Sequence, residues 1–188
     1  MQSLLKDEAF IRAATGELQS YLLSDALYWQ LSPLAEDRAA GGLVSLTPGN
    51  LLLSFKRVGA CCQAGEPLQQ FNEQAGQFAR LRSEWRSAWL KKACREYSAR
   101  LKLWDSFLSE SQAEGGRLVD YAFQVRWRTI LDLLAEDGVN PTLQQSAQLN
   151  LLDEKLKRVT CHGAFAWEEE AARAFPPASF WYLYRAQC

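Results

Sequence analysis

The sequence contains one histidine, His162, and no stretch of 18 consecutive apolar residues. Without such a stretch we expect no membrane-spanning helix. The first ten residues include Lys6, Asp7 and Glu8, so they lack the apolar core of a signal peptide. A zinc site needs about four well-placed ligands, and the sequence offers one histidine and five scattered cysteines without a Cys-x-x-Cys pair. We therefore expect a cytoplasmic protein without metal or cofactor.

Several motifs that carry chemistry are also missing. The sequence has no GxGxxG or GxxxxGK loop for phosphates, no GxSxG nucleophile turn and no Glu-x-x-His pair for a two-metal site. The five cysteines are an odd number, and Cys61 and Cys62 are adjacent, which favours reduced thiols over disulfides. The sequence identifies no reaction, so we expect a non-enzymatic protein.

The composition is that of a folded globular chain. Its 188 residues are 48% hydrophobic, and 21 basic residues against 22 acidic ones give a net charge of -1. This length suits one domain or a tightly fused pair, and the overall charge points to neither nucleic acid nor membrane. We expect one all-helical domain over 1–188, with 1–66 and 67–188 as an alternative subdivision.

The longest regular pattern runs from Pro67 to Ala113. After Pro67 it contains no proline and only one glycine, Gly76, and its apolar residues recur every three or four positions, which predicts one long amphipathic helix. At 1.5 Å per residue, that helix would be roughly 65 Å long, longer than a compact domain of this size at roughly 30–40 Å. We therefore expect it to project, or to bend near Gly76 or around 106–111.

The predicted fold class is all-α: a helical bundle of about six or seven helices around one long central helix. Strand patterns are almost absent, and 43–46 is the best candidate for a strand. The remaining helices are predicted from start and stop residues: 3–14; 17–31 with Thr15 as N-cap; one from Ser32-Pro33 to Gly41-Gly42; one from Thr47-Pro48 to Gly59; 117–136 before Gly138; one after Asn140-Pro141; a short helix at 164–174; and an aromatic turn at 180–184.

A charge bias within the long helix is the feature most suggestive of function. From Arg80 to Lys102 there are eight basic and two acidic residues, a local charge of 8 - 2 = +6, with tryptophans among them. We interpret this as a basic, aromatic-containing face on which an acidic protein partner docks, with Trp89 or Trp104 as an apolar anchor if either is exposed. The proposed partner-binding residues are Arg86, Trp89, Lys92, Arg95, Arg100 and Trp104.

Other interpretations of the same residues remain open. The basic face can bind nucleic acid through phosphates, or it can simply be a solvated helix face. Residues 1–50 carry three basic and six acidic groups, a charge of 3 - 6 = -3, and can cover it from within the chain. A third hypothesis places a small-molecule or enzymatic pocket between aromatic-rich helices, lined by Tyr121, Trp127 and Trp181.

Two C-terminal features each have a functional and a structural interpretation. Cys161 and His162 suggest a thiol–imidazole pair, but sequence neighbours rarely point at each other, and a helix-end turn is the simpler interpretation. The span 175–184 holds five aromatic residues, which can form a docking anchor or a clamp that seals the bundle end. We favour the clamp, with Phe165 and Trp167 in the same cluster.

Overall fold

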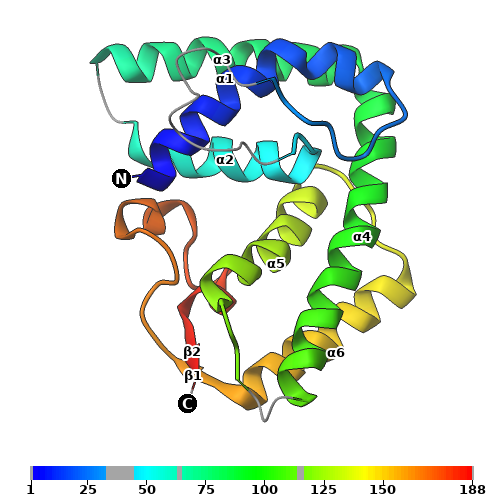
Figure 1. Cartoon of the computed structure of the whole chain (residues 1–188), viewed down its shortest axis with the longest axis vertical. Helices are drawn as coiled ribbons and strands as arrows, with labels where there is room; N and C mark the ends of the chain where they lie inside the picture. The colour runs from blue at the N-terminus through cyan, green and yellow to red at the C-terminus, as the bar shows by residue number, and fades with distance from the viewer. Residues whose placement is uncertain (1, 33–44, 63–64, 114–116, 188) are drawn as a thin grey trace. The chain divides into compact units, whose positions relative to one another are not determined.

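The computed structural model of the chain describes residues 2–32, 45–62, 65–113 and 117–187 (Figure 1). The all-α prediction is confirmed, with one small two-stranded sheet in addition. No helix among these residues is long and apolar enough to cross a membrane. The described elements are α1 (Gln2–Leu23), α2 (Pro48–Cys61), α3 (Gly65–Glu84), α4 (Arg86–Ala113), α5 (Tyr121–Glu136), α6 (Leu143–Val159), β1 (Thr160–His162), the 3-10 turns η2 (Glu169–Ala174) and η3 (Trp181–Tyr184), and β2 (Arg185–Gln187).

The chain divides into two compact units, which we call the N-terminal unit (Met1–Glu96) and the C-terminal unit (Tyr97–Cys188). The division lies within α4, so neither unit begins at residue 67. The prediction of one domain for the whole chain stays a prediction.

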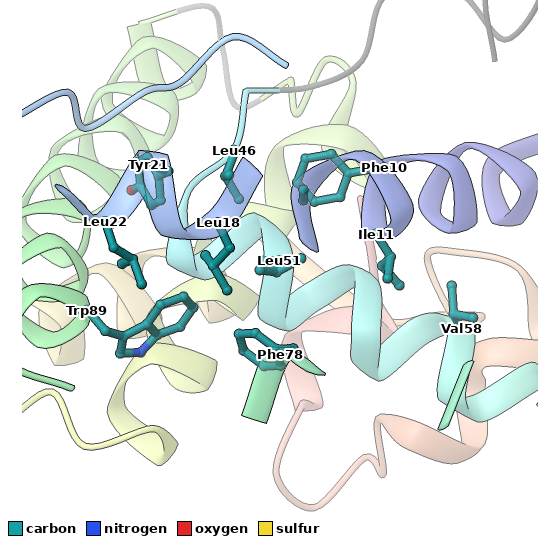
Figure 2. Close-up of a cluster of buried hydrophobic side chains, with 11 residues drawn as sticks. Phe10, Ile11, Leu18, Tyr21, Leu22, Leu46, Leu51, Val58, Phe78 and Trp89 are labelled. Carbon is teal, nitrogen blue, oxygen red and sulfur yellow. The ribbon is translucent and has the colours of Figure 1, made fainter. Parts of the chain in front are cut away.

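The N-terminal unit is built around an apolar core that α1, α2, α3 and the first turns of α4 share (Figure 2). Along α1 these side chains recur at helical spacing, as burial of one helix face requires. The fully buried or nearly buried members are Phe10, Ile11, Ala14, Leu18, Tyr21, Leu22, Leu46, Leu51, Val58, Phe78 and Trp89.

One continuous helix, α1, replaces the two helices predicted at 3–14 and 17–31. Thr15 is not an N-cap, because it lies inside α1, where its hydroxyl donates to the Ile11 carbonyl at 2.7 Å. The apolar stripe continues through Leu18 and Leu22, so a break at Thr15 would remove half of the stripe from the core. After α1 the chain passes through bends, and Trp29 forms an isolated antiparallel bridge with Leu46. The helix predicted from Ser32-Pro33 to Gly41-Gly42 lies outside the described residues.

The long helix predicted over 67–113 is interrupted at Trp85, so the expected bend at Gly76 or 106–111 was wrong. Figure 1 shows α3 and α4 meeting at a corner there. On a straight helix, positions 78 and 89 would be roughly 16 Å apart along the axis. The rings of Phe78 and Trp89 instead meet edge to face, with centroids 5.4 Å apart. The bend therefore places both aromatic rings in one core, a requirement of packing that local propensity does not encode.

The N-terminus of α2 is held by a buried carboxylate from α4. Thr47 is the N-cap, as predicted, and its hydroxyl accepts from the Asn50 amide at 3.2 Å. The same hydroxyl donates to Glu96 Oε1 at 2.6 Å, and the Gly49 amide donates to Glu96 Oε2 at 2.6 Å. Glu96 is fully buried. Its negative charge therefore meets the unpaired amides and the positive dipole end of a helix, where an anion is most stabilised.

Gly59 does not end α2, contrary to the prediction, since the helix continues to Cys61. A Cβ atom at position 59 would lie 3.0 Å from Phe71 Cζ. The glycine therefore allows the Phe71 ring of α3 to approach the backbone of α2.

Helix ends in the C-terminal unit follow local signals. Gly138 adopts φ 107 directly after the C-cap of α5, the left-handed conformation that glycine tolerates. Thr142 and Gln145 form a reciprocal capping box at the start of α6. The predicted start was Asn140-Pro141, and the capping box was not predicted.

The β1–β2 ladder was not predicted from the sequence. Its strands pair antiparallel with Cys161 opposite Ala186. Each strand has three residues, too few to show an alternating pattern, and the partners lie far apart in the sequence. The short helix predicted at 164–174 is present only as the 3-10 turn η2.

The C-terminal aromatic residues form a buried cluster, which favours the clamp interpretation over an anchor. Phe175, Phe180 and Tyr182 are at most 2% exposed. Phe165 and Trp167 contact Phe175 with ring centroids 6.3 Å and 5.2 Å away. The predicted membership of Phe165 and Trp167 in this cluster is confirmed.

A buried ion network joins α5, α6 and η3. Arg128 donates from Nε and Nη2 to both oxygens of Asp153 at 2.8 and 2.9 Å, and from Nη1 to Asp132 at 2.5 Å. The Tyr182 hydroxyl donates to the other Asp132 oxygen at 2.8 Å. Burial opposes the charge on Arg128, but the hydrogen bonds to Asp153 and the charge of Asp132 raise its pKa above the ordinary value.

We predict that Glu96→Ala destabilises the protein by about 2–3 kcal/mol, because the Thr47 hydroxyl and the Gly49 amide lose their charged acceptor in a dry site. Urea unfolding followed by tryptophan fluorescence measures the change. Glu84→Ala removes an exposed carboxylate at the end of α3 and serves as the control with little effect. Equal midpoints for the two variants would contradict the role of Glu96.

Arg128→Met is expected to cost about 3–5 kcal/mol, because it leaves two largely buried carboxylates without their cation. Thermal unfolding followed by circular dichroism is the measurement. The matched control is Arg158→Met at the exposed end of α6, which should unfold as the wild type does. A wild-type melting curve for Arg128→Met would show that the network contributes nothing to stability.

Candidate functional site

Neither tryptophan of the predicted basic face is exposed. Trp89 and Trp104 are both 0% exposed. Trp89 packs against Phe78 in the N-terminal core, and Trp104 stacks on Phe107 with ring centroids 5.5 Å apart. The exposure that an apolar anchor at Trp89 or Trp104 would require is therefore not observed.

Two of the predicted contact residues bind the segment that follows α1. Lys92 is 3% exposed and donates from Nζ to the carbonyls of Ser24 at 3.0 Å and Ala26 at 2.5 Å. Arg95 donates from Nη1 to the Asp25 carbonyl at 3.0 Å. These cations satisfy backbone acceptors just beyond the C-terminus of a helix, where positive charge is favoured. Their role inside the N-terminal unit is structural.

The basic residues of α4 do not share one exposed face. Arg100 is 4% exposed, whereas Arg86 is half-buried and Arg95 is exposed. Lys92 and Arg100 fall on the same helical stripe as the buried aromatic positions, each four residues from Glu96. This spacing is visible in the sequence and could have shown that the basic face is divided. Binding by Arg86 and Arg95 stays a prediction.

Arg126 on α5 is a cation whose surroundings among the described residues would favour a bound anion. It is half-buried, and its Nε is inaccessible to solvent and has no hydrogen-bond partner among the described residues. Its guanidinium carbon lies 3.8 Å from the centroid of the Phe123 ring, a close cation–π contact. The Phe123 ring itself is 53% exposed.

The charge of Arg126 is not balanced within the part of the chain that the structure describes. Burial, followed by the positive charge of Arg100, lowers the pKa of Arg126 to about 10. No carboxylate appears among the groups that shift this pKa, in contrast to Arg128 two residues later. An arginine without a carboxylate, next to a second arginine, is a site at which an anion would be stabilised.

Exposed apolar surface adjoins this arginine. Val119 is 55% exposed and precedes α5, and Phe123 lies one helical turn later. We call Val119, Phe123 and Arg126 the α5 entry surface. This surface was not predicted, because Arg126 lies outside the cluster of basic residues. A usable signal was present: no acidic residue lies three or four positions from Arg126 on the helix, the spacing at which surface ion pairs form.

Two of the three residues predicted to line a pocket, Tyr121 and Trp181, have structural partners. The Tyr121 hydroxyl donates to the Tyr182 carbonyl at 2.7 Å, and the ring of Trp181 lies 5.0 Å from Lys157 Nζ. Trp127 Nε1 is buried without a hydrogen-bond partner among the described residues. These contacts do not identify a reaction, and the pocket hypothesis stays a prediction.

Cys161 and His162 lie on β1 rather than in the helix-end turn that we expected. Successive side chains of a strand point to opposite faces, which does not favour a thiol–imidazole pair. Among the described residues, no group of three or more His, Cys, Asp or Glu side chains is arranged to hold a metal ion.

Lys92→Met is predicted to destabilise the protein by about 1–3 kcal/mol, because two carbonyls lose a charged donor. Lys91→Met, at the adjacent exposed lysine, is the matched variant and should leave the unfolding midpoint unchanged. Chemical denaturation of both variants distinguishes a structural lysine from a solvated one. An unfolding midpoint for Lys92→Met equal to that of the wild type would contradict the structural role of Lys92.

Comparison with known proteins adds no family to these observations: no family model matches the chain, and no curated protein or solved structure matches it.

Proposed function

We propose that this protein is a non-enzymatic binding protein whose partner is an acidic protein, docking on the α5 entry surface. The observation that carries the proposal is the guanidinium of Arg126, which is largely desolvated and has no carboxylate among its described neighbours. Native proteins pair buried charges. An unpaired one is costly unless a ligand supplies the opposite charge.

A carboxylate from a partner would gain from this preformed site. At 4 Å separation and an effective dielectric constant of 20, the attraction between two unit charges is about 4 kcal/mol. Part of the desolvation cost of Arg126 has already been met by folding, and the Phe123 ring restricts the guanidinium. An aspartate or glutamate side chain is therefore the group that fits Arg126 best.

The apolar neighbours favour a protein over nucleic acid. Val119 and Phe123 are both more than half exposed, and aromatic residues with arginine are the side chains that most often dominate protein interfaces. Binding to nucleic acid depends on several phosphate contacts, whereas the α5 entry surface contains one cation, Arg126. An acidic segment with an apolar side chain next to its carboxylate meets both parts of the surface.

Selection from a library of displayed random peptides tests this proposal. Peptides that bind the wild type should carry Asp or Glu beside a large apolar residue. They should bind Arg126→Gln roughly 10–100-fold more weakly, the loss expected when one charged hydrogen bond is removed. Phe123→Ala should weaken the same peptides, and Arg173→Gln, at an exposed arginine of η2, is the control that should not.

Stability provides an independent check on the same arginine. Because Arg126 is desolvated without an opposite charge, Arg126→Met should leave the free energy of unfolding unchanged or raise it. A loss of more than about 2 kcal/mol would show that Arg126 has a stabilising role within the chain. Selection of no acidic peptide, or binding of a single-stranded oligonucleotide by the wild type that is lost in Arg126→Gln, would also contradict the proposal.

A further inference from the structure

Helix α6 has an inner face that is fully engaged within the C-terminal unit. Gln145 donates to Ser98 Oγ at 3.0 Å, and Gln148 donates to an Asp105 carboxylate oxygen at 2.9 Å, so both bind α4. Asp153 forms the ion pair with Arg128 of α5. Leu152 and Leu156 are buried on the same side. These contacts determine which side of α6 faces outward.

The outward side of α6 carries an unusual apolar stripe. Leu143 is 91% exposed and Leu151 is 66% exposed, the two highest values for large hydrophobic residues in the described part of the chain. The exposed Ala147 lies midway between them. Residues four apart lie on one helix face, so Leu143, Ala147 and Leu151 form a line that we call the α6 outer stripe.

This stripe is symmetric about Ala147. Leu143 and Leu151 lie four positions before and after it, and the amides Gln144 and Asn150 lie three positions before and after it; all four are exposed. No charged residue occurs from 143 to 152. A surface that contacts its own copy across a two-fold axis must be self-complementary, and the order leucine, amide, alanine, amide, leucine has that property.

We infer that the occupant of the α6 outer stripe is a second copy of this chain, with the two α6 helices packed antiparallel across a two-fold axis at Ala147. In this arrangement Leu143 of each chain packs against Leu151 of the other. The small side chain at the axis lets the helices approach to the usual 8–10 Å. The amides of Gln144 and Asn150 lie opposite each other, where they can exchange hydrogen bonds.

The composition of the contact span is compatible with a self-contact. No side chain from 143 to 152 is charged, so two copies that meet there bring no like charges together. The contact is a few helical turns long, smaller than a standard stable interface, so we expect a weak dimer with a dissociation constant of about 1–100 µM.

Sedimentation of the full chain over roughly 1–500 µM tests for such a mass-action equilibrium. The wild type should shift from monomer to dimer, and Leu151→Asp should remain monomeric at every concentration. Leu23→Asp is the matched control, since Leu23 is 63% exposed on α1, and it should dimerise as the wild type does. A wild type that stays monomeric, or Leu151→Asp that dimerises normally, overturns the inference.

Disulfide trapping tests the axis and the direction. In a background in which Cys94, Cys161 and Cys188 are replaced by serine, Ala147→Cys should form a covalent dimer on mild oxidation, because the two substituted positions face each other. A mixture of Leu143→Cys and Leu151→Cys chains should cross-link with each other in preference to self-pairs. Preferential self-pairing of Leu143→Cys would overturn the antiparallel arrangement.

Discussion

Burial along one face of α4 is the constraint on which the other features of the structure depend. From Trp89 to Trp104 the positions that share this face are 0–4% exposed. They include one acid and two cations, Glu96, Lys92 and Arg100. Polar groups on a buried face must be satisfied by the elements packed against it. Glu96 accordingly binds the start of α2, and Lys92 binds the carbonyls after α1.

Two arginines on α5 differ in whether a carboxylate of the described chain balances their charge. Arg128 meets both oxygens of Asp153 and one of Asp132, so its charge is balanced within the C-terminal unit. Arg126, two residues earlier, lies on the Phe123 ring without a carboxylate among its described neighbours. The same residue type on one helix is therefore a structural element at one position and a candidate binding group at the other.

The α5 entry surface and the α6 outer stripe differ in chemistry. The first combines a desolvated cation with an exposed aromatic ring, which suits an acidic segment of another protein. The second is uncharged and symmetric about Ala147, which suits a copy of itself. Charge complementarity contributes specificity in the first case, whereas burial of leucine provides the stabilisation in the second.

Helical periodicity and capping residues in the sequence determined the all-α class, the start of α2 at Thr47-Pro48 and the end of α5 before Gly138, because these signals act over a few neighbouring residues. The bend at Trp85, the continuity of α1 through Thr15 and the β1–β2 pairing were decided by tertiary structure, because each depends on partners distant in the sequence.

The same holds for the candidate site. The sequence located a cluster of cations on α4, but only packing decided that Trp89, Lys92, Arg100 and Trp104 are buried and that Arg126 lacks a carboxylate among its described neighbours, because a side chain's environment depends on the elements that fold against it.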